Sequence, residues 1–547
     1  MNCVVEVYTM FTIKDVDFHS DDYGVEPYLN NWPMLYILEN GKKAYVGQTN
    51  SINKRMSQHK DADSKKIFTR AHFIYCDKFN QSATFDYESR LISLMAADKQ
   101  FVLTNQNAGL SGIDYYDKPS YDQEFVELWN QLQKKKLVKS TIEELEKSDL
   151  FKYSPYKTLS DEQRSIVTEI VDNLRKNLNR SIIVGGIPGS GKTILAVYLF
   201  KLLRESKDFK ELEIGFVVPP TSLRKTMKMV FKGLNNLSAK DVLGPTEITK
   251  KKYDILIVDE SHRLKKRKNL QSYKVYDDAC ERIGLSNTST QVDWILKQSK
   301  CSIFFFDKDQ IVFPAGLNVA QIIQNDSFST RMMAYYNLLS QMRCEGGVGY
   351  LGDIFSLLYD KLDHKVSDIN YEIRLVDDFS TFDELYKLKE KQVGLTRMIA
   401  GYAWEWKSKG DETHTVIDFE IEGHNLRWNS KLENWVHTNE AVNEVGCIHS
   451  IQGYDLNYGF VILGEDIRFD EAHNKIFVDK EAYKDTYGKR QASDRELERY
   501  IKNIYYVLLS RGIKGTYVYV CDNALRKHLE NYINRFTAND LKAIKAI

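Results

Sequence analysis

A glycine-rich run of nine residues constrains this chain more than any other feature: Gly185-Gly186-Ile187-Pro188-Gly189-Ser190-Gly191-Lys192-Thr193. From Gly186 onward it fits the spacing G-x-x-x-x-G-K-[ST]. An apolar run at 181–184 precedes it, and a helical pattern begins at Ile194. Glycines let successive backbone N–H groups curl around phosphates, so this run between a strand and a helix predicts a nucleotide-binding loop.

Each residue type in the loop has its own expected task. The phosphates are expected to lie against the small residues Gly186, Gly189, Ser190 and Gly191. Lys192 can reach the β- and γ-phosphates, and the Thr193 hydroxyl can bind Mg²⁺. The expected cofactors are therefore ATP and Mg²⁺.

An apolar strand that ends in two acids follows later in the chain, within Asp254-Ile255-Leu256-Ile257-Val258-Asp259-Glu260-Ser261-His262. A strand of this kind after a phosphate loop is placed to bind the metal. Asp259 is expected to hold Mg²⁺ with Thr193, and Glu260 to polarise the attacking water.

The apolar runs from residue 158 onward indicate an α/β fold. They form two series separated by helical stretches: 182–184, 214–218, 255–258 and 303–306, then 372–376, 415–419, 459–463 and 516–520. Short apolar runs that alternate with helices imply parallel sheets covered on both faces. We therefore predict two parallel-sheet domains with a cleft between them.

The N-terminal part has a different pattern. Strand-like runs at 35–38 and 44–46 flank Glu39-Asn40-Gly41, and Asn-Gly between apolar runs is a strong hairpin signal. Residues 123–148 indicate charged helices, and a break follows at Pro155. The expected organisation is an extension at 1–30, a small α+β domain at 31–115, a helical connector at 116–155, and parallel-sheet domains at 156–330 and 331–547.

Composition limits the partners and the compartment. Charged residues make up 28% of the chain and the formal net charge is zero, so any nucleic-acid groove must be a local basic surface. The run Lys265-Lys266-Arg267-Lys268 is one candidate, although such runs are more often solvated faces. Seven scattered cysteines without a C-x-x-C pair fit a reducing cytoplasm. With no apolar run of about 18 residues, the expectation is a cytoplasmic protein without membrane contact.

The ordered motifs after residue 156 resemble those of superfamily 1 helicases, and the best match is the Schlafen group 3-like DNA/RNA helicases, over residues 156–522. Asp259-Glu260-Ser261-His262 looks like motif II. The other matched segments are Leu159–Gln163, Phe306–Gln310, Leu338–Cys344, His449-Ser450-Ile451-Gln452-Gly453 and Asn503–Gly512.

This resemblance implies two RecA-like P-loop domains and roles for four residues outside the loop. Gln163 is expected to contact adenine, and Gln310 to sense the γ-phosphate. Arg343 and Arg511 are expected to stabilise the transition state, because charge grows on the γ-phosphate oxygens as the bond breaks.

A second resemblance, to GIY-YIG nuclease domains, covers the N-terminal unit. It is carried by Tyr36, Tyr45, Gly47, Arg55, Glu88 and Asn105, while Met34 and Val46 replace two usual motif residues. The resemblance implies phosphodiester hydrolysis in which Glu88 holds one divalent metal and Arg55 neutralises the phosphate. Tyr36 would take a proton from water, and Tyr45 would orient or share that role.

His59 lies one helical turn after Arg55, so the two share a helix face. It would serve as the base or as a helper, while a lone helical histidine is more often structural.

Together these patterns predict an ATP-dependent nuclease-helicase that acts on nucleic acid, with DNA as the expected substrate and defence against foreign DNA as a role by analogy. One metal-binding acid makes one site that cuts one strand, so duplex cleavage would need two passes or an oligomer. Two alternatives stay open: a nucleotide-gated nuclease without translocation, and an ATPase that binds nucleic acid without cleaving it.

Overall fold

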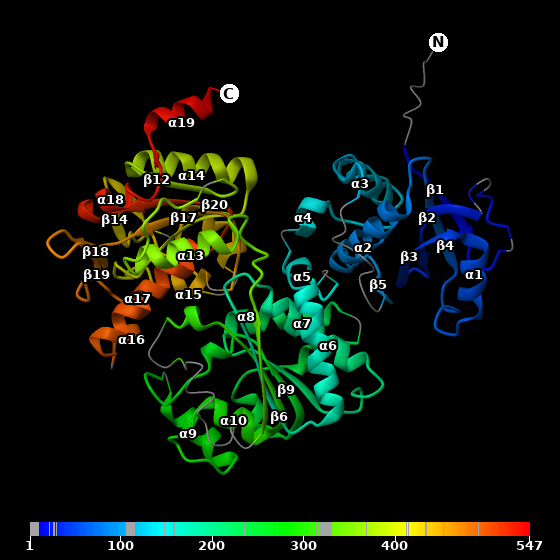
Figure 1. Ribbon diagram of the computed structural model, residues 1–547, viewed down its shortest axis with the longest axis horizontal. Helices are drawn as coiled ribbons and strands as arrows, with labels where there is room; N and C mark the ends of the chain where they lie inside the picture. The colour runs from blue at the N-terminus through cyan, green and yellow to red at the C-terminus, as the bar shows by residue number, and fades with distance from the viewer. Residues whose placement is uncertain are drawn as a thin grey trace. The chain divides into compact units, whose positions relative to one another are not determined.

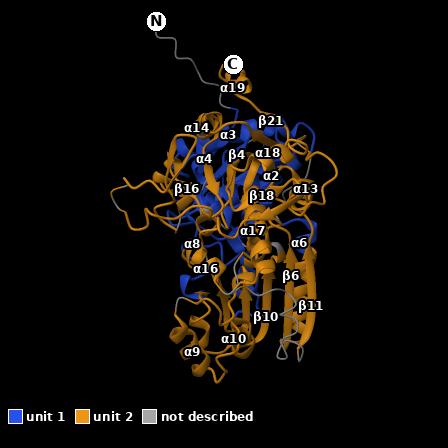
Figure 2. Cartoon of the chain, turned by 90° about the vertical axis from the view of Figure 1, so that its left-hand side faces the viewer, with its two compact units in different colours: residues 1–164, 197–210, 227–241 blue, residues 165–196, 211–226, 242–547 orange. Residues whose placement is uncertain are grey.

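The computed structural model describes residues 10–20, 22–25, 28, 30–105, 115–146, 148–156, 159–234, 236–270, 272–312, 316, 331–367, 369–411, 413, 415–432, 435–451, 453–490 and 492–546. The chain divides into two compact units. Figure 2 shows the first, of residues 1–164, 197–210 and 227–241, in blue, and the second, of residues 165–196, 211–226 and 242–547, in orange.

The first unit is built on a mixed five-stranded sheet with the strand order β1-β4-β2-β3-β5. Its strands are β1 (Thr12–Asp17), β2 (Asn30–Glu39), β3 (Lys43–Ser51), β4 (Arg70–Tyr75) and β5 (Val102–Leu103). The predicted hairpin is confirmed, since β2 and β3 pair antiparallel up to Glu39 and Ala44. Gly41 takes φ +80°, and Asn40 Oδ1 accepts hydrogen bonds from the backbone N–H groups of Lys42 and Lys43.

Helices complete the first unit. They are α1 (Ile52–Asp61), α2 (Gln81–Asp98), α3 (Lys118–Lys134), α4 (Ile142–Glu146) and α5 (Asp149–Lys152). The helices expected at 123–148 are thus present. A capping Asn80 side chain starts α2, and buried residues follow along that helix, among them Tyr87 and Leu91. This packing holds α2 against β2 and β3, and so places Glu88 beside the hairpin.

The first sheet of the second unit is all-parallel, with the order β11-β6-β10-β9-β7-β8. Its strands are β6 (Arg180–Gly186), β7 (Ile214–Val217), β8 (Val242–Leu243), β9 (Tyr253–Val258), β10 (Ser299–Phe306) and β11 (Met332–Leu338). The helices between these strands are α6 (Asp161–Lys176), α7 (Lys192–Glu205), α8 (Thr221–Lys232), α9 (Tyr273–Arg282) and α10 (Gln291–Gln298). Residues 161–164, 197–205 and 227–232 of the first three helices are counted in the first unit. All four apolar runs of the first predicted series are strands of this sheet, and Figure 1 labels β6 and β9 among them.

The second sheet of this unit is also parallel, with the order β16-β13-β17-β20-β12-β21. Its strands are β12 (Glu372–Val376), β13 (Thr396–Ala400), β16 (Val445–Gly446), β17 (Leu456–Leu463), β20 (Gly512–Val520) and β21 (Arg535–Phe536). Its helices are α13 (Gly347–Leu358), α14 (Phe379–Val393), α15 (Ile448–Ile451), α16 (Thr486–Lys489), α17 (Asp494–Leu509), α18 (Asn523–Leu529) and α19 (Ala538–Lys545).

One predicted strand of the second series is wrong. Residues 415–418 are not in a strand, and β14 (Phe419–Ile421) forms a small antiparallel hairpin with β15 (His424–Leu426) instead. The parallel sheet takes β13, whose run Thr-Arg-Met-Ile-Ala buries all five residues. An arginine and a threonine inside that run hid it from a reading based on apolar residues.

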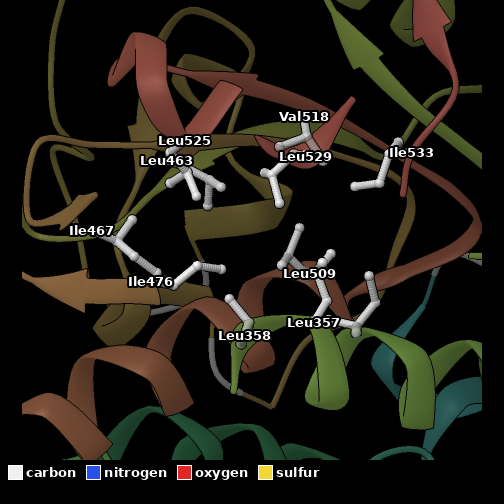
Figure 3. A pocket seen from close by; sticks show the side chains of 11 residues that line it. Leu357, Leu358, Leu463, Ile467, Ile476, Leu509, Val518, Leu525, Leu529 and Ile533 are labelled. Atoms are coloured by element: carbon white, nitrogen blue, oxygen red, sulfur yellow. The ribbon is translucent and has the colours of Figure 1, made fainter. Parts of the chain in front are cut away.

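The second sheet packs on an apolar core. Figure 3 shows side chains from α13, α18 and strands β17 and β20 that meet there, including Leu357, Leu463, Val518 and Leu529. A second antiparallel hairpin, β18 (Ile467–Asp470) with β19 (Lys475–Val478), adds Ile467 and Ile476 to this layer. The side chains that line the gap are all aliphatic, so it belongs to the core and offers no polar group to a ligand.

None of the helices in the described part of the chain is both long and apolar enough to cross a membrane.

Candidate active sites

The first candidate site lies in the first unit, where β2 and α1 bring Tyr36, Arg55 and His59 together. The Tyr36 hydroxyl lies 2.8 Å from His59 Nε2, and Arg55 Nε donates to the same hydroxyl at 3.1 Å. Burial, followed by the charges of Arg55 and Lys65, lowers the pKa of His59 to about 4. His59 is therefore neutral near pH 7 and can accept the Tyr36 proton.

The close approach of two strands explains the glycine in this site. Gly47 faces Tyr36 across the hairpin, and a Cβ atom at Gly47 would overlap the Tyr36 phenol. Asn105 holds the same strand through two hydrogen bonds to Val46. Its Oδ1 accepts from the Val46 N–H at 3.1 Å, and its Nδ2 donates to the Val46 C=O at 2.8 Å. Asn105 thus holds the β3 backbone in place, which is the contact the structure shows for this predicted site residue.

Tyr45 is half-buried and hydrogen-bonds Tyr36. Burial raises the pKa of both phenols, in Tyr36 more strongly than in Tyr45. Lys65 Nζ lies 3.0 Å from the centre of the Tyr45 ring. Burial, aided by the Arg55 charge, lowers the pKa of this lysine to about 8. Lys65 follows α1 in a turn and carries no motif signal, so sequence reasoning missed it.

Glu88 supplies the carboxylate of the site. Burial raises its pKa to about 7, although the Arg55 charge and the backbone N–H of Gln48 oppose the shift. A buried carboxylate held by so little positive charge fits a divalent cation, because oxygen ligands and charge neutralisation are what Mg²⁺ requires. No cluster of three or more acidic, His or Cys residues suited to a metal occurs among the described residues, so Glu88 would be the protein ligand with water and phosphate oxygens completing the shell.

Replacing Gly47 with alanine tests the close approach. The added methyl group must displace the buried Tyr36 ring, so we expect a loss of about 1–3 kcal/mol in stability of the first unit and a disrupted Tyr36–His59 contact. Thermal unfolding of the full chain and a cleavage assay measure the two effects. Gly41→Ala is the matched control for strain alone, because a Cβ there meets nothing within 4 Å while its φ is +80°.

The pKa of Glu88 predicts a pH dependence of metal binding. Protons compete with the metal below pH 7, so the apparent Mg²⁺ affinity of this site should rise about tenfold between pH 6 and pH 8 and then level off. Titration of Mn²⁺ or Mg²⁺ by calorimetry at several pH values measures it. An affinity that stays flat over this range in the wild type, or a slope that survives in Glu88→Gln, would contradict the assignment.

The second candidate site lies at the carboxyl end of β6, where the phosphate loop leads into α7 at Lys192. Gly189 and Gly191 take φ values of +80° and +78°, which only glycine adopts without strain. The Lys192 ammonium is buried and donates to Gly186 O, Ile187 O and Asp307 Oδ2 at 2.8, 2.8 and 2.9 Å. The predicted loop is therefore a strand-to-helix turn with its lysine folded along it.

Asp307 forms hydrogen bonds with two of the predicted site residues, Lys192 and Gln310. It follows β10 directly, is fully buried, and its Oδ2 accepts from Lys192 and from Gln310 Nε2, at 2.7 Å for the glutamine. Gln310 is thus joined through Asp307 to the lysine of the phosphate loop. An acid at the end of an apolar strand was the signal used for Asp259, and it would also have found Asp307.

The acids at the end of β9 have the features of a metal site. Asp259 is buried, accepts a hydrogen bond from Thr193, and its Oδ2 has no hydrogen-bond partner among the described residues. Burial and the neighbouring Glu260 raise the pKa of Asp259. His262 Nε2 lies 3.1 Å from Glu260 Oε2 and, against the effect of burial, lowers the pKa of Glu260. The orphaned carboxylate oxygen beside Thr193 fits Mg²⁺.

Both predicted arginines, Arg343 and Arg511, belong to the second unit. Arg511 is fully buried, donates to Val507 O and Tyr454 O, and its Nη2 has no partner among the described residues. Burial, then the charge of Arg343, lowers the pKa of Arg511 to about 10, while Asp455 and Glu260 oppose that shift. The Arg343 guanidinium forms an ion pair with Asp455.

Three further predictions concern Gln163, Gln452 and the basic run 265–268. Gln163 belongs to the first unit, where it forms a capping box with Ser160 at the start of α6 and is buried. Gln452 of the fifth motif lies outside the described residues. In the basic run 265–268, Arg267 pairs with Asp277 and Lys268 lies 4.0 Å from Glu496.

The fold and these sites define the class of the protein. A small mixed-sheet domain with a tyrosine, arginine and glutamate site precedes a P-loop unit with two parallel sheets. Residues 33–100 match the GIY-YIG catalytic domain, and residues 179–522 match the Schlafen group 3, DNA/RNA helicase domain. The second match covers more than half of the chain, which therefore belongs to the Schlafen group 3 DNA/RNA helicase domain family and carries an endonuclease-class domain in front of a helicase-class ATPase domain.

Several known proteins are similar to this chain. An uncharacterized protein of Saccharomyces cerevisiae is 25% identical over 427 residues, which are 68% of this chain and 90% of the yeast protein. The Pif1 helicase of Candida albicans is 11% identical, with a TM-score of 0.28, over 71% of this chain and 99% of its own. The arterivirus nonstructural protein 10 helicase is 13% identical, with a TM-score of 0.29, over 64% of this chain and 62% of its own.

Proposed function

We propose that the chain is an ATP-dependent nuclease-helicase, in which the first unit hydrolyses phosphodiester bonds and the second uses ATP to move along or unwind nucleic acid. One observation carries the proposal: a single chain holds two separate sets of side chains suited to phosphate chemistry. One is Tyr36, Arg55, His59 and Glu88, and the other surrounds Lys192. The proposed substrate is DNA.

In the nuclease site, a chain of hydrogen bonds would carry the proton of the attacking water. Tyr36 is fully buried, so Tyr45 is the phenol that keeps access to solvent. Tyr45 bonds Tyr36, which in turn bonds the neutral His59. We infer that Tyr45 takes the proton from water while its own phenolic proton passes to Tyr36 and that of Tyr36 passes to His59, so no phenolate needs to persist despite the raised pKa values.

Two cations and one acid would act on the phosphate. Arg55 lies between the tyrosines and Glu88, where its guanidinium can neutralise charge on the phosphate as a fifth oxygen adds. A metal held by Glu88 would supply Lewis acidity and stabilise the leaving oxygen. Lys65 adds a second positive charge near Tyr45.

In the ATPase site, different side chains would bind the phosphates, the metal and the attacking water. Lys192 would exchange Asp307 for the β- and γ-phosphates, and Thr193 with Asp259 would hold Mg²⁺. Glu260, kept ionised by His262, would orient the attacking water.

The test is a cleavage and strand-displacement assay on labelled single- and double-stranded DNA and RNA, with and without ATP and Mg²⁺. The proposal predicts metal-dependent cleavage, ATP hydrolysis stimulated by nucleic acid, and displacement of an annealed strand that requires ATP. Cleavage gated by ATP without displacement would favour the nucleotide-gated nuclease. Binding without cleavage in any metal would leave only a nucleic-acid-binding ATPase.

A further inference from the structure

The segment of residues 339–346 links the two sheets of the second unit, and we call it the linking segment. It leaves β11, whose last residue Leu338 pairs with Gly186 of the phosphate loop, and it leads into α13. The segment therefore begins beside the phosphate loop and ends at the second sheet.

At its first end the linking segment contacts the phosphate loop itself. The N–H of Met342 donates to Gly189 O at 3.0 Å. The Gln341 amide occupies the space over Gly189, where a Cβ would lie 2.5 Å from Gln341 Oε1. The same Oε1 accepts from the backbone N–H groups of Arg343 and Cys344, while Nε2 is buried with no partner among the described residues. Gln341 thus ties the position of the Arg343 backbone to the phosphate loop.

At its second end the segment is held by the second sheet. The Arg343 guanidinium pairs with Asp455, which immediately precedes β17, and the N–H of Glu345 donates to Ile513 O at 2.9 Å. The Arg343 and Asp455 side chains are only 17% and 18% exposed, so solvent screens their attraction weakly. The charge of Arg343 lowers the pKa of Arg511 and that of Asp455 raises it, so both charges act on Arg511.

These contacts place an arginine that is paired with a carboxylate on a segment fixed to the phosphate loop. A guanidinium binds a carboxylate or a phosphate through the same kind of N–H donors, so a phosphate that takes the donors facing Asp455 displaces that carboxylate. We propose that Asp455 is a positioning residue that competes with the γ-phosphate of ATP for the Arg343 guanidinium, so that binding of a triphosphate exchanges one ion pair for the other. This inference rests on the proposed ATPase function.

The test measures equilibrium binding of a non-hydrolysable ATP analogue and of ADP to the full chain. Asp455→Asn removes the competing charge, so the analogue should bind about 5- to 10-fold more tightly while ADP, which has no γ-phosphate, binds unchanged. Combined with Arg343→Ala, the Asp455→Asn change should have no effect on either ligand, because Asp455 acts through that arginine. Asp455→Glu keeps the charge and should retain the wild-type ratio of the two affinities.

Asp411→Asn is the matched control, since Asp411 pairs with Arg427 at 2.8 Å in the same unit with similar exposure and, among the described residues, touches none of the phosphate loop. Equal tightening for ADP and the analogue, no tightening, or tightening that persists without Arg343 would overturn the inference. Wild-type protein that binds neither nucleotide, or a Lys192→Ala variant that binds both normally, would instead refute the ATPase function, and the inference would fall with it.

Discussion

Glu88→Ala is expected to abolish metal-dependent cleavage, with a loss of about 10³-fold or more in rate. Glu88 is the single carboxylate that the described residues bring to the site, and its removal takes away both the proposed metal ligand and the negative charge that Arg55 faces. Cleavage of a labelled strand at saturating Mg²⁺ and at pH 8, where the wild-type carboxylate is ionised, measures the effect.

The ATPase provides the internal control for this variant. Hydrolysis of ATP by Glu88→Ala should equal that of the wild type, because none of the contacts described for the phosphate loop involves Glu88. Glu127→Ala, an exposed acid on α3, should cleave normally. Retention of cleavage by Glu88→Ala would remove the nuclease site as described, whatever the ATPase does.

Lys192→Ala is expected to lower nucleic-acid-stimulated ATP hydrolysis by about 10²- to 10³-fold. The buried Lys192 ammonium is the group that can stabilise negative charge on the β- and γ-phosphates. No other lysine donates to the loop carbonyls in the described part of the chain. Steady-state hydrolysis with and without DNA measures kcat and KM separately.

The same variant distinguishes the proposed functions. Because Asp307 loses its cation inside the protein, thermal unfolding must confirm that Lys192→Ala remains folded, and Lys297→Ala, an exposed lysine on α10, is the control for charge alone. Lost displacement with retained cleavage supports a motor joined to an independent nuclease. Loss of cleavage together with hydrolysis supports the nucleotide-gated nuclease, and unchanged hydrolysis contradicts the ATPase assignment.

The sequence allowed the motif residues of the two sites to be predicted, but not the partners that those residues contact. The phosphate loop, the acids at 259 and 260 and the hairpin at Asn40-Gly41 were recognisable because each depends on short spacings along the chain. The partners of those residues were not. Asp307 holds Lys192 across 115 residues, and Lys65 reaches Tyr45 from a turn with no motif.

The strand order was equally out of reach of the sequence. β11 lies beyond the expected boundary at residue 331 yet pairs with β6, and β13 enters the second sheet with a run that an arginine and a threonine interrupt. Pairing between distant strands depends on how whole sheets pack and on which backbone groups remain to be bonded, so composition within one run carries little information about it.

By itself the sequence predicted a phosphate loop and an acid-ended strand for a metal, since each depends on short spacings along the chain, and its resemblance to GIY-YIG nuclease domains implied the tyrosine, arginine and glutamate set. Only the tertiary structure decided that Tyr36 meets a neutral His59 and that Arg343 meets Asp455. The reason is physical: burial and long-range packing set which charges are neighbours and how strongly water screens them, and neither quantity is a property of a short stretch of chain.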